Sequence, residues 1–317
     1  MEKKVLLIGA GPMAVDYAKV LIDMKVPFIT VGNTEKSAAE FKEKTGQDVI
    51  LGGIKNYLKN NTEVFPKVVN AAPEHLLGEV TLDLINAGYK DILVEKPGGK
   101  NYEDVKMVAE TANANDAKVY VGYNRRFFAS VEKAKEIIKE DGGVTSFYFE
   151  FTEWSHIIGT LKKGEGVLEE WFLHNSSHII DLAFYLGGKP KNFSTYTSGS
   201  LSWHPSGAVF TGAGVTDSGA LFSYNANWEA PGRWVVEILT RKHRLLFKPV
   251  EKLQIQKIGS VAVEFLEIDD KTDTDFKPGL HKQVENYLND KFENISDINE
   301  QLANIENYYN KICKGSK

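Results

Sequence analysis

Two histidines and an aspartate lie at helical spacing in the segment LHNSSHIID, residues 173–181. An α-helix turns about 100° per residue, so steps of four and seven residues place His174, His178 and Asp181 within an arc of ~60°. One helix face would then carry three groups that can transfer protons or bind a metal. Imidazole titrates near neutral pH, which suits His178 to act as a general base or acid. The segment is therefore the first candidate for catalysis.

Other roles for these three side chains stay open on the sequence alone. A His-x-x-x-His pair also suits zinc, but a catalytic zinc normally has three protein ligands, and no Glu or Cys motif marks a third. We therefore expect no metal site. His178 could instead be a structural histidine at a domain interface, and His174 could orient substrate, share a proton relay or only line a cleft. Asp181 is expected to hold its surroundings in place rather than to react.

The elements that must position this segment follow from the pattern of apolar runs. Strands and helices alternate over the first 120 residues, in runs such as KVLLIGA, AVDYAKVLIDM and PFITVG, which predicts a doubly wound parallel sheet covered by helices on both faces. After Tyr123 the pattern changes: a helical run and a strand come first, and from Asn192 to Asp269 β-rich runs between glycine, proline and Asp-Ser turns predict an antiparallel sheet. Helices are expected near 168–186, 279–290 and 296–312. We place a first α/β domain at 1–122 and a second at 123–317.

Composition limits the classes of function. A chain of 317 residues with 42% hydrophobic and 26% charged residues fits a globular protein of two domains. The net charge of −5 and the lack of a long basic run argue against nucleic acid as a partner. The single cysteine, Cys313, leaves no disulfide framework. No apolar run is long enough for a signal peptide or a membrane span, so we expect a cytoplasmic protein with no membrane partner.

A glycine-rich turn near the N-terminus predicts a dinucleotide site. In LLIGAGPMA, Gly9, Gly11 and Ala14 have the G-x-G-x-x-A spacing directly after a strand and at the start of a helix, with Pro12 and Met13 between them. The first glycine permits a tight turn, the second lets the backbone approach a pyrophosphate, and the alanine lets helix pack closely on strand. The helix N-terminus adds amide donors and positive potential. The first domain is therefore expected to be a Rossmann domain.

The end of the second strand bears on the choice of cofactor. An NAD site usually has an acidic residue about 20 residues beyond the glycines, where it binds the ribose hydroxyls. Here Gly32, Asn33 and Thr34 occupy that place, followed by Lys36 and Ser37, which could bind a 2′-phosphate. We expect NADP(H) in preference to NAD(H). Alternatively these residues only cap the next helix, and Glu35 then leaves NAD(H) open.

A lysine ends another strand of the predicted parallel sheet. In DILVEKPGGK, Glu95, Lys96 and Pro97 lie at the carboxyl edge, where open α/β sheets bind ligands. Together with GAGPMA, the Ala-Ala-Pro-Glu-His turn at 71–75 and the YNRRF run at 123–127, this element resembles the Gfo/Idh/MocA oxidoreductase family over the full length of the chain. The resemblance implies a Rossmann domain followed by a substrate-binding and oligomerisation α/β domain with an open, mostly antiparallel sheet.

The resemblance also implies roles for particular residues. Lys96 would bind substrate and take part in a proton relay, and His178 falls at the family's acid/base histidine. His174 falls where the family more often has aspartate or asparagine, so substrate contacts here are expected to be atypical. Arg125 and Arg126 could contact an anionic substrate or a cofactor phosphate, with one of them in a structural ion pair. The residues expected to contact the cofactor are Gly9, Gly11, Pro12, Met13, Ala14, Gly32, Asn33, Thr34, Ala72, Pro73, His75, Glu95, Lys96, Asn124 and Arg125.

The expected activity is an NAD(P)-dependent oxidoreductase that transfers hydride between nicotinamide and a secondary alcohol or ketone of a sugar, cyclitol or sugar derivative. Such a protein would bind a small carbohydrate-like substrate and form a homodimer or homotetramer. Two alternatives remain: a non-catalytic dinucleotide-binding regulator of the same fold, and an enzyme that uses tightly bound cofactor for elimination or glycoside cleavage. A sugar ring could stack on one of the tryptophans Trp154, Trp171 and Trp203, which otherwise are core or interface residues.

Overall fold

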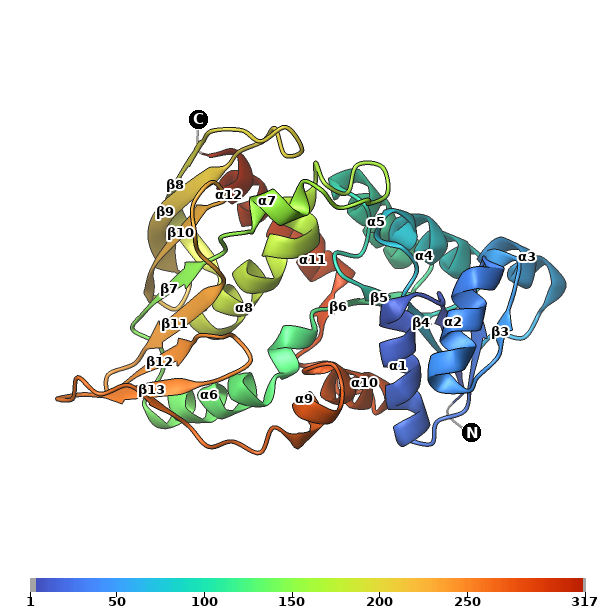
Figure 1. Ribbon diagram of the computed structural model, residues 1–317, viewed down its shortest axis with the longest axis horizontal. Coiled ribbons are helices and arrows are strands. Elements are labelled where there is room, and N and C mark those ends of the chain that lie inside the picture. Colours follow the sequence, from blue (N-terminus) through green and yellow to red (C-terminus); the bar gives the residue numbers. More distant parts are fainter. Residues whose placement is uncertain (1–3, 316–317) are drawn as a thin grey trace. The chain divides into compact units, whose positions relative to one another are not determined.

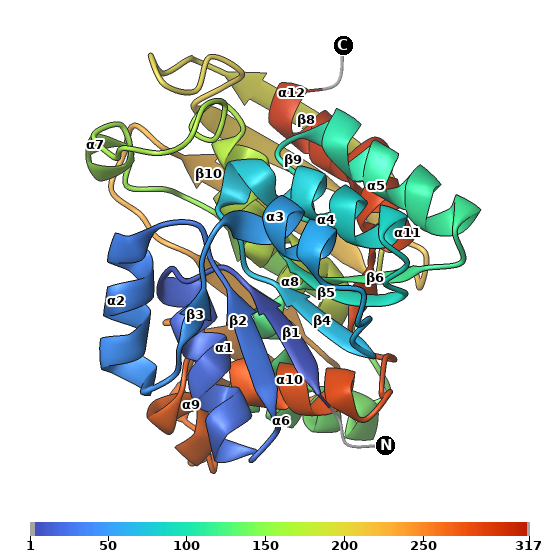
Figure 2. The same ribbon diagram turned by 90° about the vertical axis from the view of Figure 1, so that its right-hand side faces the viewer.

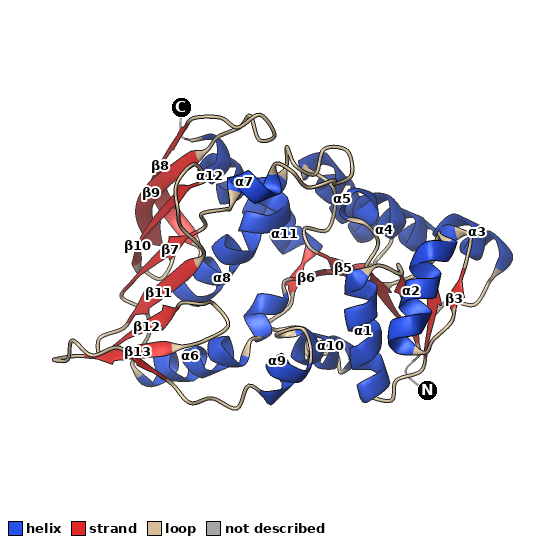
Figure 3. Cartoon of the chain, viewed as in Figure 1, coloured by secondary structure: helices blue, strands red, loops and turns tan. Residues whose placement is uncertain are grey.

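The computed structural model describes residues 4–315, and the chain divides into two compact units. Met1–Asn124 and Thr272–Ala303 form the first, and Arg125–Lys271 and Asn304–Lys317 form the second. Figure 1 labels the elements of both units, and Figure 3 shows the same chain coloured by secondary structure.

The first unit is built on a seven-stranded sheet with the order β15-β6-β5-β4-β1-β2-β3. Its strands are β1 (Val5–Ile8), β2 (Phe28–Val31), β3 (Val49–Ile50), β4 (Lys67–Asn70), β5 (Asp91–Glu95), β6 (Lys118–Gly122) and β15 (Ser296–Asp297). β1 to β6 pair in parallel, and their central members are apolar and buried on both faces, as a covered parallel sheet requires. The predicted doubly wound Rossmann sheet is confirmed.

Helices cover both faces of this sheet. They are α1 (Pro12–Asp23), α2 (Glu35–Thr45), α3 (Gly53–Asn60), α4 (Leu77–Asn86), α5 (Tyr102–Ala114), α10 (Leu280–Leu288) and α11 (Ile298–Asn304), with a short 3₁₀ turn η1 (Glu74–Leu76). α1 packs against α2 and α10, whereas α4 packs against α3 and α5. Figure 2 shows these two groups on opposite sides of the strands. α1 turns its apolar residues to the sheet, and Ala14, Tyr17, Ala18 and Leu21 are fully buried.

The C-terminal part of the chain contributes to the first unit. Residues 272–303, which the sequence analysis assigned to the second domain, pack here: β15 pairs antiparallel with β6, joining Ser296 to Val121, and α10 lies against α1. The hydroxyl of Tyr287 on α10 donates to the carbonyl oxygen of Asp91, which fastens the helix to the sheet. Long-range pairing of this kind leaves no local signal in the sequence. The pairing also gives the otherwise parallel sheet one antiparallel edge.

The second unit has an eight-stranded sheet with the order β14-β13-β12-β11-β7-β10-β9-β8. Its strands are β7 (Ser146–Glu150), β8 (Pro190–Ser198), β9 (Val209–Thr216), β10 (Leu221–Asn227), β11 (Val235–Leu239), β12 (His243–Phe247), β13 (Gln254–Lys257) and β14 (Glu264–Phe265). β7 and β10 pair in parallel and all other neighbours are antiparallel. The predicted mostly antiparallel sheet is confirmed.

One helix covers the middle of this sheet and forms its core. α8 (Ser177–Gly187) packs on β7 and β11. Phe184 of α8 meets Phe147, Phe149 and Phe222 of the sheet with ring centroids 5.1 to 5.9 Å apart, mostly edge to face. Each buried phenylalanine contributes roughly 1.5–3 kcal/mol through burial alone. The remaining helices of the unit are η2 (Asn124–Phe127), α6 (Ala129–Glu140), α7 (Ser155–Ile158) and α12 (Asn310–Lys314).

Two predicted helices are not regular. The helix expected at 168–186 consists of a π-helical turn at Phe172–Ser176 followed by α8, and the segment 296–312 divides into β15, α11, a second π-helical turn at Ile305–Tyr309 and part of α12. A π-turn carries one extra residue per turn, which shifts the side chains before it around the helix axis. Apolar periodicity alone does not distinguish such a turn from an α-helix. Among residues 4–315 no helix is long and apolar enough to cross a membrane.

Candidate functional site

The glycine-rich turn of the first unit joins β1 to α1 and is shaped by contact with β4. Gly9 has a φ of 109°, and a Cβ at this position would collide with the carbonyl oxygen of Ala71, so only glycine fits. Gly11 is the N-cap of α1, and a Cβ there would meet nothing within 4 Å. Pro12 occupies the first turn of α1, where its missing N–H costs nothing. The turn therefore presents open backbone and a helix N-terminus, which suits a phosphate group.

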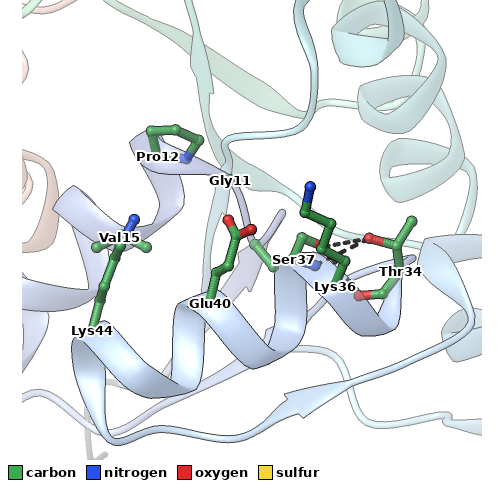
Figure 4. A pocket seen from close by; sticks show the side chains of 9 residues that line it. Gly11, Pro12, Val15, Thr34, Lys36, Ser37, Glu40 and Lys44 are labelled. Atoms are coloured by element: carbon green, nitrogen blue, oxygen red, sulfur yellow. Dashed lines mark hydrogen bonds between the residues drawn. The ribbon is translucent and has the colours of Figure 1, made fainter.

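A pocket of about 260 Å³ lies beside this turn, between the start of α1 and one side of α2 (Figure 4). It is lined by Ala10, Gly11, Pro12, Val15, Thr34, Lys36, Ser37, Glu40 and Lys44. The hydroxyl of Thr34 lies 2.7 Å from that of Ser37 and accepts from its backbone N–H at 3.3 Å, so Thr34 caps α2. Two lysines against one glutamate give the lining a net positive charge. Sequence reasoning named Lys36 and Ser37 but missed Glu40 and Lys44, which lie one and two helical turns further along α2.

The predicted contacts after β4 are held by a short hydrogen-bond network. The side chain of Asn70 donates to the carbonyl of Leu77 and to the hydroxyl of Thr81, and it accepts from the N–H of Ala72 at 3.2 Å. Pro73 then starts the 3₁₀ turn that contains His75. The network fixes the backbone at the carboxyl end of β4, next to the turn that Gly9 makes against Ala71.

Glu95 and Lys96 end β5 at the same sheet edge. The hydroxyl of Tyr17 on α1 donates to Oε1 of Glu95 at 2.7 Å, and burial raises the pKa of this carboxyl although Tyr17, Lys96 and Lys277 oppose the effect. Glu95, which was predicted to contact the cofactor, thus accepts a hydrogen bond from Tyr17 of α1. The Lys96–Pro97 peptide is cis, and Gln301 donates to the carbonyl of Pro97 at 3.1 Å. The residues on either side of Lys96 are therefore fixed by hydrogen bonds, Glu95 by Tyr17 and Pro97 by Gln301.

The two remaining predicted cofactor residues fall on the boundary between the units. Asn124 is buried in the first unit, where its amide donates to the carbonyl of Pro278 at 2.8 Å. Arg125 belongs to the second unit, where its guanidinium carbon lies 4.8 Å from the ring centroid of Trp234. Adjacent residues in the sequence thus belong to different units.

The histidine segment is buried in the second unit. His174 lies in the π-helical turn and His178 in the first turn of α8, where its ring centroid is 6.3 Å from that of Trp234. Asp181 accepts two hydrogen bonds from Arg126, at 2.8 and 2.5 Å, and both side chains are buried. Asp181 is therefore paired with Arg126 inside the second unit, and its supporting role stays a prediction. Within residues 4–315 no three His, Cys, Asp or Glu side chains converge as metal ligands do.

A buried carboxylate that sequence reasoning missed lies beneath the π-helical turn. Oε1 of Glu153 accepts from Asn175 Nδ2 and Ser176 Oγ, both at 2.9 Å, and Oε2 lies 3.6 Å from a guanidinium nitrogen of Arg233. Its side chain has no exposed surface. Burial raises the pKa of Glu153 to about 7, although the two hydrogen bonds and the arginine favour the ionised form. The carboxyl is therefore only partly ionised at neutral pH.

Arg233 lies between two tryptophans. Its guanidinium carbon is 4.9 Å from the ring centroid of Trp154 and 4.6 Å from that of Trp234. We call Arg125, Trp154, Arg233 and Trp234 the arginine–tryptophan cluster. Its members come from three distant segments, TEW after β7, GRW before β11 and YNRRF after β6. Trp154 and YNRRF were singled out in the sequence, but Arg233 and Trp234 were not. No local spacing announces the others, because antiparallel pairing of β7 with β11 brings them together.

Comparison with known proteins agrees with these observations. Residues 3–123 match the model of the Gfo/Idh/MocA oxidoreductase family, NAD-binding Rossmann fold. None of the curated proteins matches the chain in sequence.

Solved structures of three enzymes share the fold over nearly the whole chain. One is a levoglucosan dehydrogenase in complex with NADH and L-sorbose, with a TM-score of 0.76, 19% identity, and coverage of 98% of this chain and 96% of that chain. Another is a UDP-N-acetylglucosamine 3-dehydrogenase from Acidithiobacillus ferrooxidans, with a TM-score of 0.72, 14% identity and coverage of 96% and 94%. A third is an oxidoreductase from Agrobacterium radiobacter in complex with NAD⁺, L-tartaric acid and magnesium, with a TM-score of 0.74, 14% identity and coverage of 95% and 93%. The family match thus covers the N-terminal Rossmann domain, residues 3–123, and the solved structures show that nearly the whole chain shares their fold.

Proposed function

We propose that the protein is an NAD(P)-dependent dehydrogenase or reductase that interconverts a secondary alcohol and a ketone on a carbohydrate-like substrate. The observation that carries the proposal is the turn at Gly9 and Gly11, which has the geometry of a dinucleotide site inside a domain that matches an NAD-binding oxidoreductase family. Two neighbours of the same fold are sugar dehydrogenases, which supports a sugar, cyclitol or sugar derivative as substrate.

We propose that the pyrophosphate binds at the turn from Gly9 to Ala14 and the adenine ribose in the pocket beside it. Lys36 and Ser37 would donate to a 2′-phosphate there, with Lys44 adding positive charge, which supports NADP(H) over NAD(H). The lack of a carboxylate at Gly32, Asn33 and Thr34 points the same way. Remaining contacts are assigned to Ala72, Pro73, His75, Glu95, Lys96, Asn124 and Arg125 by resemblance to the family.

For catalysis we propose that Lys96 and His178 act on the same substrate hydroxyl. In the oxidative direction the ammonium of Lys96 donates a hydrogen bond to the hydroxyl oxygen and lowers the energy of its developing negative charge. His178 accepts the hydroxyl proton as the C–H bond breaks and the carbonyl forms. A bound nicotinamide cofactor would supply the hydride acceptor, so that one proton and one hydride would leave the substrate. His174 would contact the substrate beside His178, and Asp181 with Arg126 would hold α8 in place.

Turnover of the variants Lys96→Ala and His178→Ala tests this assignment. A sugar, cyclitol and nucleotide-sugar screen, followed at the absorbance of reduced nicotinamide, first identifies a substrate. Removal of a group that donates to the transition state or takes the proton should then lower kcat by roughly 10²–10⁴-fold. The proposal is wrong if both variants keep full turnover. Glu103→Ala, on the exposed face of α5, is a matched control and should keep wild-type turnover.

We also expect a homodimer or homotetramer in the cytoplasm. The second sheet leaves large apolar side chains exposed, among them Tyr196 on β8, Leu221 on β10 and Phe265 on β14, each more than 60% accessible. Contact between copies would cover this apolar surface. Multi-angle light scattering should give a mass of two or four chains, and a single-chain mass at micromolar concentration would contradict the expectation.

A further inference from the structure

The arginine–tryptophan cluster occupies the ends of two paired strands in the second unit. β7 and β11 pair antiparallel with Val235 opposite Glu150, so the segments 151–154 and 232–234 continue side by side beyond the pairing. The indole N–H of Trp154 donates to the carbonyl of Gly232 at 3.1 Å, which ties the two segments together. Strand pairing and this hydrogen bond therefore fix the backbone that carries Trp154, Arg233 and Trp234.

Arg233 lies over two indole rings and remains half exposed. Indole rings approach the guanidinium at 4.9 and 4.6 Å, and the side chain is 49% exposed. Its ion partner, Glu153, is 3.6 Å away, which is too long for a hydrogen bond. In the described part of the chain, no protein acceptor makes a hydrogen bond with this guanidinium. A guanidinium that lies over aromatic rings and has no hydrogen-bond acceptor can form a two-pronged contact with an oxyanion.

The charges around the cluster favour an anion over a neutral group. Arg233 and Arg125 bring two permanent positive charges to the ring of Trp234. Glu153 balances them only in part, because burial keeps this carboxyl partly protonated near neutral pH. The nearby carboxylate of Glu150 lies against Gly232 and forms no ion pair with either guanidinium in the described residues. The positive charge of Arg233 is therefore only partly compensated by its ion partner, Glu153.

The cluster also touches the proposed base. Trp234, which contacts both arginines, lies with its ring centroid 6.3 Å from that of His178. Arg233 and His178 therefore both lie close to the ring of Trp234. A carbohydrate with an oxyanion at one end could reach both.

We propose that Arg233 is a specificity-determining residue and that the substrate is a carbohydrate bearing an oxyanion, either a carboxylate or a phosphate ester. This inference rests on the proposed function for the location of the reaction, but its binding prediction stands independently of turnover. Trp154 and Trp234 position the guanidinium, Arg233 contacts the oxyanion, and Arg125 adds charge.

Matched pairs of probes test the inference by calorimetry and by turnover on the cofactor-saturated protein. Glucose is compared with glucuronate and with glucose 6-phosphate, and galactose with galacturonate. We expect an acidic sugar to bind at least tenfold more tightly than its neutral partner. The affinities of glucuronate and glucose 6-phosphate then show whether a carboxylate or a phosphate is preferred. Equal affinity within every pair would overturn the inference. If acidic probes bind selectively but no sugar is turned over, only the proposed function fails.

Variants of Arg233 locate the effect. Arg233→Met keeps an apolar stem between the tryptophans and should lose the preference for the acidic probe, while Arg233→Lys keeps the charge and should retain part of it. Arg244→Met is the control, because Arg244 on β12 is similarly exposed and pairs with Glu237 on the same sheet. A preference that survives Arg233→Met unchanged, or that Arg244→Met abolishes equally, contradicts the assignment. Because Arg233 is half exposed, Arg233→Met should fold. If it does not fold, the comparison of acidic and neutral probes on the wild-type protein still tests the inference.

Discussion

The glycine turn of the first unit and the arginine–tryptophan cluster of the second are built in opposite ways. The turn is formed by consecutive residues, from Gly9 to Ala14, whose conformation is dictated by one positive φ and one close approach to Ala71. The cluster is formed by residues almost 110 positions apart, from Arg125 to Trp234, that only strand pairing unites. The comparison separates a site set by local backbone geometry, which a motif can announce, from one set by tertiary structure, which it cannot.

The largest expected effect concerns the support of the second unit. Asp181→Ala leaves the buried guanidinium of Arg126 without its two hydrogen bonds, and loss of one partner of a buried ion pair costs about 3–5 kcal/mol. Urea unfolding followed by tryptophan fluorescence should show this loss in free energy of unfolding. Asp217→Ala, at an exposed turn of the same unit, is the control and should lose less than 1 kcal/mol. A loss below 1 kcal/mol for Asp181→Ala would show that the ion pair does not support α8.

A somewhat smaller effect is expected at the glycine turn. Gly9→Ala must place a Cβ against the carbonyl of Ala71 at a positive φ, which should cost about 2–4 kcal/mol of stability and abolish measurable cofactor binding. Gly11→Ala meets no protein atom, so it should leave stability within about 1 kcal/mol of wild type but weaken the binding of the dinucleotide. Calorimetry and urea unfolding of both variants make the comparison. Equal destabilisation by the two changes would refute the geometric distinction.

The buried carboxyl beneath the histidine segment predicts a dependence of stability on pH. The pKa of Glu153 is about 7 in the folded chain against an ordinary value of 4.5, so between these pH values the folded state binds more protons than the unfolded state. Stability therefore falls as pH rises through this window, by up to about 3 kcal/mol from this group. Glu153→Gln keeps an oxygen that accepts from Asn175 and Ser176 but cannot ionise.

Unfolding of the wild type and of Glu153→Gln, measured from pH 4.5 to 8, isolates this contribution. The wild type should lose about 2–3 kcal/mol relative to the variant over the range, and most of that loss should be complete by pH 7.5. Parallel stability curves would mean that Glu153 titrates near its ordinary value and that Arg233 is fully paired at neutral pH. That result would also weaken the case for an anionic substrate.

The smallest effect concerns the choice of cofactor. Lys36→Ala should weaken NADPH binding by about tenfold and change NADH binding by less than about twofold, because only NADPH carries the 2′-phosphate. Lys59→Ala on α3 is the control, since it is exposed and lies outside the pocket lining. Tighter binding of NADH than of NADPH by the wild-type protein would overturn the NADP(H) preference itself.

Much of the fold could be predicted from the sequence, because the periodicity of apolar residues distinguishes strands from helices. The sequence also pointed to Gly9, whose required conformation is a property of consecutive residues, and to Asp181, which lies at helical spacing from His178. The placement of 272–303 in the first unit could not be predicted, because it depends on β15 pairing with β6 across more than 170 residues. The π-helical turn at Phe172–Ser176 was missed for a different reason: its apolar pattern is that of an α-helix.

For the candidate sites the same division holds. Lys96 ends a strand that the sequence marks, whereas Glu153 and Arg233 come from segments with no motif and acquire their properties from burial and stacking. A single acidic residue after a strand is ordinarily exposed, so nothing in TEW distinguishes Glu153 from a surface carboxylate. Electrostatic features created by tertiary packing are therefore the part that requires coordinates.

The most direct test of the central claim follows the hydride itself. A substrate found in the screen is prepared with deuterium on the carbon that bears the reactive hydroxyl, and the nicotinamide product is isolated after turnover. If the protein is a dehydrogenase of the proposed kind, the deuterium appears at C4 of the reduced nicotinamide in a ratio of one per ketone formed. Consumption of the substrate with no deuterium in the released nicotinamide would contradict the account and point to chemistry in which the cofactor is restored within each cycle.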